Sequence, residues 1–298
     1  ALLAMIYTQD SREELSDPAT WVKSNPCFGA SGKPEFLEEQ YHTMRTKPEQ
    51  ESAILTKNFN LWVQASDIWI TDDVWCACRS ETPVESLAGC ACYAGLDLGS
   101  VNDFSSLVLA FHENDRTQRL PFFWIPEEKY RTRREMQREN ANIDVWVRQG
   151  LLRITPGNVT DYEVIRRDIA RLAEQYDIRK IGYDRWNSSQ LVIDLLNDGL
   201  PMDGFQQSIS NISPPTKEFE RLARSGDLEH YGNPILRWMV SNVVVYRDAN
   251  DNLKPVKNRS PEKIDGVVAA IEAIGEWMSA QRTPPARSIY EERGLRTF

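Results

Sequence analysis

The stretch YAGLDL at residues 93–98 is the first clear strand of the chain, and an aspartate, Asp97, lies near its end. Two further apolar runs follow, SLVLAF at residues 106–111 and LPFFWI at residues 120–125. Polar turn residues bound these runs, as is typical of strands. Three such strands in succession, joined by short turns, predict an antiparallel meander.

Strand and helix alternate after the meander. A polar, arginine-rich helix is expected at residues 132–148, and a strand at residues 178–184 that ends at Asp184. A last helix is expected from Pro261 to about Ala280, because apolar residues recur there at helical spacing. This order predicts an α/β fold with a mixed sheet and flanking helices, for which a ribonuclease-H-like arrangement is the best-known solution.

The chain is expected to consist of three parts. Residues 1–90 lack a clean alternation of strand and helix and predict a small, mostly helical and irregular segment, with one helix near residues 35–45. Residues 91–282 carry the predicted sheet, and residues 283–298 predict a flexible tail that contains proline and arginine. The chain does not begin with Met, which suggests a fragment of a longer protein.

The composition is that of a globular protein, with 41% hydrophobic and 27% charged residues. No apolar run approaches the roughly 20 residues that a membrane-spanning helix needs. The formal net charge of −9 argues against a protein that coats itself with nucleic acid, since general DNA binders usually have basic surfaces. An enzyme that contacts DNA locally is still compatible with this charge, because a metal-dependent nuclease concentrates carboxylates at its cations.

The five cysteines include two C-x-C pairs, at residues 76–78 and 90–92. Residues i and i+2 of a strand face the same side, so such pairs are compatible with zinc. Zinc ligands are usually separated by two to four residues, however, and the chain has only 3 histidines. Reduced cysteines are therefore favoured, and a zinc site stays open as the alternative.

Three aspartates form a candidate catalytic constellation: Asp97, Asp184 and Asp265. If the strand that ends at Asp184 lies parallel beside the first strand, the first two carboxylates are neighbours. Asp265 lies near the start of the last helix, next to the small Gly266, which would let that helix lie close to the sheet. Converging carboxylates repel one another, and two divalent cations, Mg²⁺ or Mn²⁺, are the natural compensation. Taken singly, each aspartate is equally explained as a turn former or a helix-terminal acid.

Three segments resemble the acidic motifs of the nuclease domain in large terminase subunits of tailed bacteriophages. GLDLGS at residues 95–100, followed by Asp103, is similar to the first motif, YDRWN at residues 183–187 to the second, and NRSPEKIDG at residues 258–266 to the third. The tryptophans at positions 62, 69 and 75 lie in a stretch similar to the segment that links the family's ATPase domain to its nuclease domain. The resemblance covers nearly the whole chain.

The resemblance implies a ribonuclease-H-like endonuclease that cuts concatemeric double-stranded phage DNA during genome packaging. Asp97, Asp184 and Asp265 would be its catalytic, metal-binding acids, and Asp103 is either an auxiliary metal-binding acid or a turn cap. Residues 1–90 would be the end of the ATPase domain and the linker. The implied partners are DNA, the small terminase subunit and the portal protein of the procapsid, in the cytoplasm of the infected bacterium, with no membrane.

Two further expectations concern nucleotide and DNA binding. The phosphate loop of the family's ATPase is not found here, since Gly32-Lys33 lacks both the first glycine and the final Ser or Thr of that motif, so this chain alone is not expected to hydrolyse ATP. Basic side chains near the acids, or in the run near residue 131, are candidate contacts to the DNA backbone, although a solvated charged surface explains them as well. They are Lys257, Arg259, Lys263, Arg131, Arg133 and Arg134.

Two other classes of protein share part of these signals. Residues 95–102 also resemble the first phosphate loop of actin-like ATPases and sugar kinases, but no second glycine-rich loop follows Asp184. A non-catalytic module that docks DNA or the portal, with structural acids, is the other alternative. Acid-dependent binding of Mg²⁺ or Mn²⁺ distinguishes a nuclease from such a module.

Overall fold

The computed structural model describes residues 5–30, 32–46, 48–61, 69–99, 104–113, 116–136, 143–185, 189–260 and 262–282. The chain divides into two compact units, Ala1–Ile68 and Trp69–Phe298. In the part of the chain that the structure describes, no helix has both the length and the apolar character that crossing a membrane requires.

The first unit is a small helical body around one tryptophan. Its helices are α1 (Pro34–Thr46) and α2 (Pro48–Phe59), preceded by two short 3-10 turns. The indole of Trp21 is buried against the rings of Phe28, Tyr41 and Phe59, and its Nε1 donates a hydrogen bond to the carbonyl of Leu15 (3.1 Å). The expected helix near residues 35–45 corresponds to α1.

The second unit is built on a mixed sheet whose order is β4-β3-β2-β1-β5-β6, with β7 also paired to β3. Strands β1, β2 and β3 form the predicted antiparallel meander, and β5 lies parallel to β1. The remaining pairs, β3 with β4, β3 with β7 and β5 with β6, are parallel. The strands are β1 (Ala91–Asp97), β2 (Ser105–Glu113), β3 (Arg116–Pro126), β4 (Leu152–Thr155), β5 (Asp177–Asp184), β6 (Met202–Phe205) and β7 (Leu228–His230).

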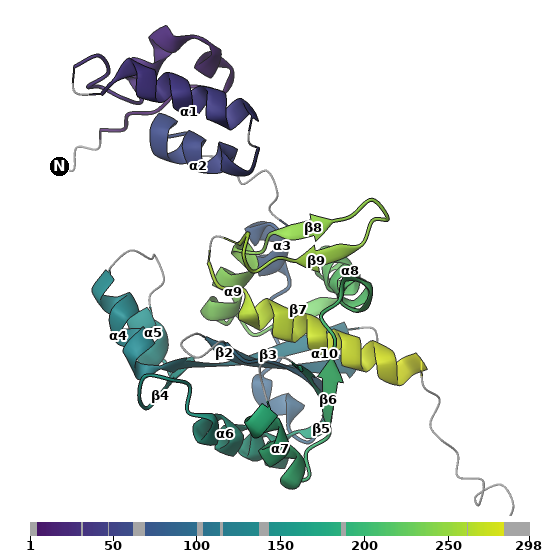
Figure 1. The fold of residues 1–298 in the computed structure, drawn as a ribbon. Helices are drawn as coiled ribbons and strands as arrows, with labels where there is room; N and C mark the ends of the chain where they lie inside the picture. Colours follow the sequence, from purple (N-terminus) through teal and green to yellow (C-terminus); the bar gives the residue numbers. More distant parts are fainter. Residues whose placement is uncertain are drawn as a thin grey trace, which may run out of the picture. The chain divides into compact units, whose positions relative to one another are not determined.

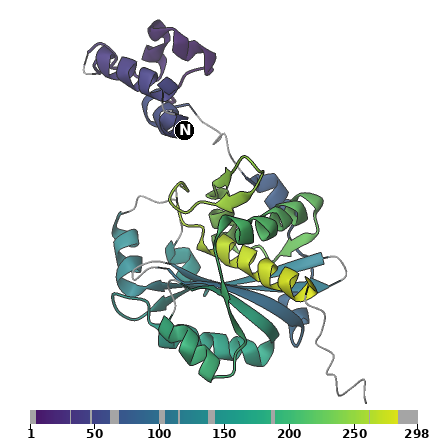
Figure 2. The same cartoon turned by 45° about the vertical axis from the view of Figure 1, so that its right-hand side comes forward.

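Helices cover both faces of this sheet (Figures 1 and 2). Helices α6 (Tyr162–Gln175) and α7 (Ser189–Asn197) lie on one face. On the other lie α8 (Ile209–Ser225), α9 (Pro234–Ser241) and α10 (Asp265–Arg282). A separate hairpin, β8 (Val245–Arg247) and β9 (Leu253–Pro255), precedes α10. The predicted mixed sheet with flanking helices is therefore confirmed.

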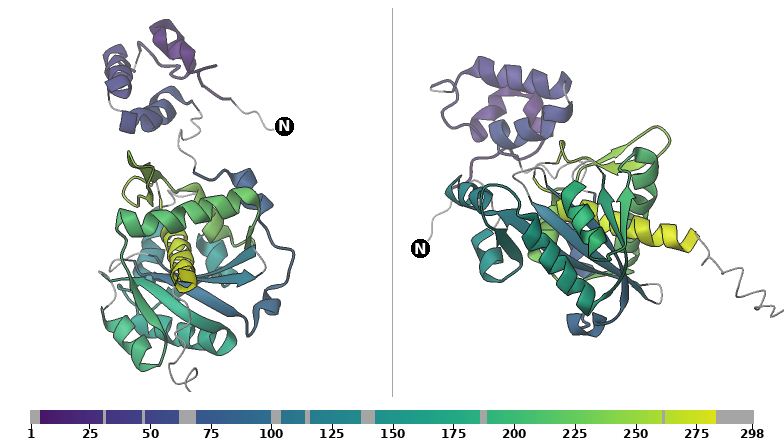
Figure 3. Two further views of the ribbon diagram at one scale, coloured as in Figure 1. Left: turned by 90° about the vertical axis from the view of Figure 1, so that its right-hand side faces the viewer. Right: turned by 60° about the horizontal axis from the view of Figure 1, so that its bottom comes forward.

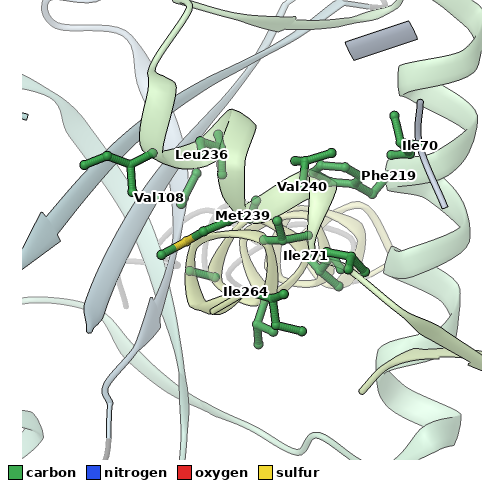
Figure 4. Packing of buried hydrophobic residues seen from close by; sticks show 14 of the residues in the cluster. Ile70, Val108, Phe219, Leu236, Met239, Val240, Ile264 and Ile271 are labelled. Atoms are coloured by element: carbon green, nitrogen blue, oxygen red, sulfur yellow. The ribbon is translucent and has the colours of Figure 1, made fainter. Parts of the chain in front are cut away.

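Helix α10 is the most deeply buried helix of this unit and runs across the sheet (Figure 3). All of its residues from Asp265 to Ile274 are buried. Figure 4 shows side chains of this core, in which Ile264 and Ile271 pack with residues of α8 and α9 such as Phe219 and Met239. A helix buried all round is held by packing on every side, which fixes its position relative to the strands.

Two helix predictions require correction. The last helix begins at Asp265 rather than Pro261, because the carbonyl of Ile264 is the first to accept helical hydrogen bonds, from the N–H groups of Val267 and Val268. Pro261 itself lies outside the described residues. The single helix expected at residues 132–148 corresponds to α4 (Glu127–Met136) and α5 (Ile143–Arg148). Two glutamates favour an earlier start of α4, since acids stabilise the first turn of a helix.

The boundary between the compact units lies at residues 68/69, whereas the predicted parts divide at 90/91. Residues 69–90 include a short helix, α3 (Asp72–Ala77), that packs on the sheet unit. Trp69 and Trp75 both stack on Phe219 of α8, with ring centroids 5.3 and 6.2 Å away. The aromatic residues of this stretch therefore belong to the core of the second unit.

Candidate active site

The register between β1 and β5 brings two of the predicted acids together. The strands are parallel, and the last pair in the register is Leu96 with Tyr183. Asp97 and Asp184 follow as the final residues of their strands. Parallel strands end at the same edge of the sheet, so both carboxylates lie at one edge. The convergence proposed from the sequence is present in the fold.

Two glycines let α10 pack closely against this part of the sheet. Gly95 of β1 pairs with Gly182 of β5, two residues before each aspartate. A Cβ atom at Gly95 would lie 2.0 Å from the carbonyl oxygen of Ala269 in α10, and one at Gly182 would lie 2.9 Å from the side chain of Glu276. This close packing places the beginning of α10, and with it Asp265, at the edge where the strands end.

Lys257 connects the first and third acids. Its ammonium Nζ lies 2.5 Å from Oδ2 of Asp97 and 2.9 Å from Oδ1 of Asp265. Partial burial alone would lower the pKa of Lys257, but the charges of Asp97 and Asp265 outweigh it and raise the pKa above its usual value. The carboxylates are 2% and 5% exposed, so the lysine holds a cation in a largely enclosed acidic environment.

The electrostatics of the site are dominated by burial of like charges. The pKa of Asp97 is raised to about 6, chiefly by burial and also by the charges of Asp265 and Asp184, although Lys257 opposes this effect. A carboxylic acid this strongly perturbed beside a charged cluster is a common feature of functional sites.

A fourth acid, Glu272, was not recognised from the sequence. It is fully buried in α10, and its Oε1 accepts a hydrogen bond from Nε2 of Gln207 (2.9 Å). Burial raises its pKa well above the usual value, and the charges of Asp97 and Asp184 add to this effect. The signal in the sequence was its spacing: Glu272 follows Asp265 by seven residues, which places both on one face of a helix. Glu272 was overlooked because the residues around it in this helix are mostly apolar and suggested packing alone.

The other predicted site residues have mixed positions. Asp103 lies outside the described residues, as does the side chain of Arg134. Arg131 is exposed and pairs with Glu127, and the guanidinium of Arg133 lies over the ring of Phe104 (5.3 Å). Arg259 lies over the ring of Tyr246 in the hairpin (5.8 Å), and Lys263 is partly buried two residues before Asp265. Among the predicted basic contacts, Lys257 lies in direct contact with two of the predicted catalytic acids, Asp97 and Asp265.

The donor atoms fit a divalent cation by their chemistry. Three buried carboxylate oxygens have no hydrogen-bond partner among the described residues, Oδ2 of Asp265, Oε2 of Glu272 and Oε2 of Glu276, of which the last lies 3.1 Å from the ammonium of Lys180. Carboxylate oxygens are the ligands that Mg²⁺ and Mn²⁺ prefer. Among the described residues, no group of three or more His, Cys, Asp or Glu side chains is already arranged to hold a metal ion. The position between Asp97 and Asp265 is taken by the ammonium of Lys257 instead.

The chain has five cysteines. All are free thiols, with Cys78 and Cys92 buried and Cys27 and Cys76 exposed. The thiol of Cys78 contacts the carbonyl of Ala223 in α8 (3.3 Å), and burial raises the pKa of Cys92 to about 12. These two thiols pack as apolar side chains.

Comparison with known proteins agrees with this fold. The family described as "Terminase large subunit, endonuclease domain" matches residues 1–281. The large terminase subunit of Enterobacteria phage HK97 is 31% identical over 277 residues, which are 92% of this chain and 54% of that protein. Protein YmfN of Escherichia coli strain K12 is 29% identical over 307 residues, covering 100% of this chain and 68% of that protein.

The crystal structure of the HK97 large terminase superposes on this chain with a TM-score of 0.64 at 31% identity, over 92% of this chain and 57% of that one. The mixed sheet with helices on both faces matches the ribonuclease-H-like fold of the large terminase nuclease domains. The chain belongs to the family of large terminase subunit endonuclease domains. It spans about half the length of the HK97 protein.

Proposed function

We propose that this chain supplies the metal-dependent endonuclease activity of a phage packaging enzyme, which cuts concatemeric double-stranded DNA. The observation that supports this most strongly is the convergence of Asp97 and Asp184 with Asp265 of the closely packed α10. Membership of the endonuclease family favours this function over a phosphotransferase of the actin-like or sugar-kinase class.

In the proposed site, Asp97, Asp184 and Asp265 hold two divalent cations, Mg²⁺ or Mn²⁺. When bound, such ions activate a water molecule for attack on a phosphodiester and stabilise the oxygen that leaves. Asp97 is a neighbour of Asp184 through the strand register and shares Lys257 with Asp265, so it would hold an ion together with either acid. Lys257 pairs with Asp97 and Asp265, and an ion held there would leave its ammonium available to a DNA phosphate.

The remaining expectations belong to the same proposal. The basic side chains near the site, Lys257, Arg259 and Lys263, contact the DNA backbone and offset the net negative charge of the chain locally. The first unit is the end of the ATPase domain together with its linker. The partners are the small terminase subunit and the portal protein, and the enzyme acts in the cytoplasm of the infected bacterium.

The test is incubation of the chain with supercoiled plasmid in Mg²⁺, Mn²⁺ or EDTA. Nicking and linearisation that require the metal are expected for the parent and lost in Asp184→Asn. Asp177→Asn is a matched control, because Asp177 begins the same strand at the opposite edge of the sheet and pairs with Arg179 (2.5 Å). Equal cleavage by the parent and Asp184→Asn would refute the assignment of the acids, and a folded parent without any cleavage would favour a docking module.

A further inference from the structure

Glu272 lies on the side of α10 that faces the acidic cluster. It follows Asp265 by seven residues, two helical turns along the same face. On this face Ala269 meets Gly95 of β1 and Glu276 meets Gly182 of β5, so Glu272, which lies between them at helical spacing, faces the same two strands that end at Asp97 and Asp184. Its side chain is fully buried, with an exposed fraction of 0%. The glutamate is thus a member of the cluster, although it belongs to none of the three motifs that the sequence suggested.

In the described part of the chain, no lysine or arginine forms an ion pair with the carboxylate of Glu272. Gln207, which follows β6, donates to Oε1, while Oε2 has no hydrogen-bond partner among the described residues. Lys257 is the cation whose charge acts on Glu272, but its ammonium already contacts Asp97 and Asp265. Burying a carboxylate without a paired cation is costly, so such a group is rarely present for packing alone.

Glu276, one turn further along α10, shows the contrasting arrangement. It is also buried, with an exposed fraction of 4%, but its Oε2 lies 3.1 Å from the ammonium of Lys180. Its charge is thus balanced within the protein. The two glutamates share a helix, a chemical group and burial, and they differ in whether a protein cation compensates them.

We propose that Glu272 is a fourth carboxylate ligand of the divalent cations in this site and that Gln207 is the positioning residue that holds it. This inference rests on the proposed metal-dependent function. Gln207 fixes Oε1 by its hydrogen bond, which leaves Oε2 to bind the cation shared with Asp97 and Asp184. A purely structural role would need only the bond to Gln207, which an amide at position 272 makes equally well. What an amide lacks is the second charged oxygen.

The decisive experiment is calorimetric titration of the full chain with MnCl₂, which measures binding without cleavage. Glu272→Gln is expected to weaken Mn²⁺ binding by about 10–100-fold or to remove one of the bound ions, as changes around metal ligands do. Glu276→Gln is the matched control and is expected to leave the titration unchanged. The inference is overturned if Glu272→Gln binds Mn²⁺ as the parent does.

Two further variants keep the test decisive. If Glu272→Gln does not fold, as judged by circular dichroism, Gln207→Ala replaces it, because this partly exposed residue leaves the carboxylate intact but unheld. It is expected to weaken Mn²⁺ binding severalfold, and an unchanged titration overturns the inference. Asp97→Asn separates the two proposals: a parent that binds no Mn²⁺, or an Asp97→Asn variant that binds it fully, refutes the metal site itself. If Asp97→Asn loses Mn²⁺ binding while Glu272→Gln or Gln207→Ala binds as the parent does, the metal site stands and only the role of Glu272 is refuted.

Discussion

Gly95→Ala is expected to damage both stability and activity, because α10 leaves no room for a methyl group at this position. The added Cβ would lie 2.0 Å from the carbonyl oxygen of Ala269 and 2.8 Å from the backbone nitrogen of Ala273. Overpacking of a core costs about 1–3 kcal/mol, and a clash with backbone cannot be relieved by a change of rotamer, so we expect about 3 kcal/mol. For a unit of this size the melting temperature falls by about 2–4 °C per kcal/mol, hence by about 6–12 °C.

The same substitution moves the start of α10 away from the strands. Misplacement of a catalytic group by about 1 Å can reduce a rate by about a hundredfold, so plasmid cleavage should fall by that order even when the variant is folded. The matched control is Gly182→Ala, whose added Cβ meets the flexible side chain of Glu276 at 2.9 Å and which should cost about 1 kcal/mol. Thermal melting by circular dichroism measures both. Equal melting temperatures for the parent and Gly95→Ala would refute the close packing on which the position of Asp265 depends.

The remaining predictions concern charge, pH and the extent of the folded unit. Lys257→Met should destabilise the metal-free protein by about 1–3 kcal/mol, since it leaves buried carboxylates unpaired, and Mg²⁺ should restore its melting temperature; a parent-like melting curve without metal contradicts this. The raised pKa of Asp97, about 6 against an ordinary 3.8, contributes stability below pH 4 that is lost as the pH rises through 6. Metal-free protein should therefore be more resistant to urea at pH 5 than at pH 7, and Asp97→Asn should reduce this difference; the opposite pH trend would show that other groups dominate. A fragment of residues 69–298 should fold as a unit, whereas one of residues 91–298 loses the buried Trp69 and Trp75 and should melt at a lower temperature; equal melting would contradict the boundary at 68/69.

The features that could be predicted from the sequence depend on local pattern and chain order. Three short apolar runs separated by polar turns allow little except a meander, and the next strand ends at an aspartate as the first does. The neighbouring positions of Asp97 and Asp184 follow from that order, once the later strand is placed parallel to the first. The third acid could be placed because it begins a helix with an apolar stripe.

The features that could not be predicted depend on contacts between distant residues. Glu272 looked like one polar residue in a buried helix, and only the register of α10 on the sheet reveals that it faces the acids. Lys257 was predicted as a DNA contact. In the structure its ammonium bridges Asp97, which lies 160 residues earlier in the chain, and Asp265, which lies 8 residues later. The packing of Trp69 and Trp75 on Phe219 of α8 could not be predicted either, because it joins residues about 150 positions apart in the chain.

The measurement that tests the central claim most directly is the anomalous diffraction of Mn²⁺ in crystals of this chain. The account predicts anomalous density among Asp97, Asp184 and Asp265, with the ammonium of Lys257 withdrawn from Asp97. Density elsewhere in the molecule, or none at all in a protein that still cuts plasmid DNA with its lysine in place, would contradict the metal centre described above.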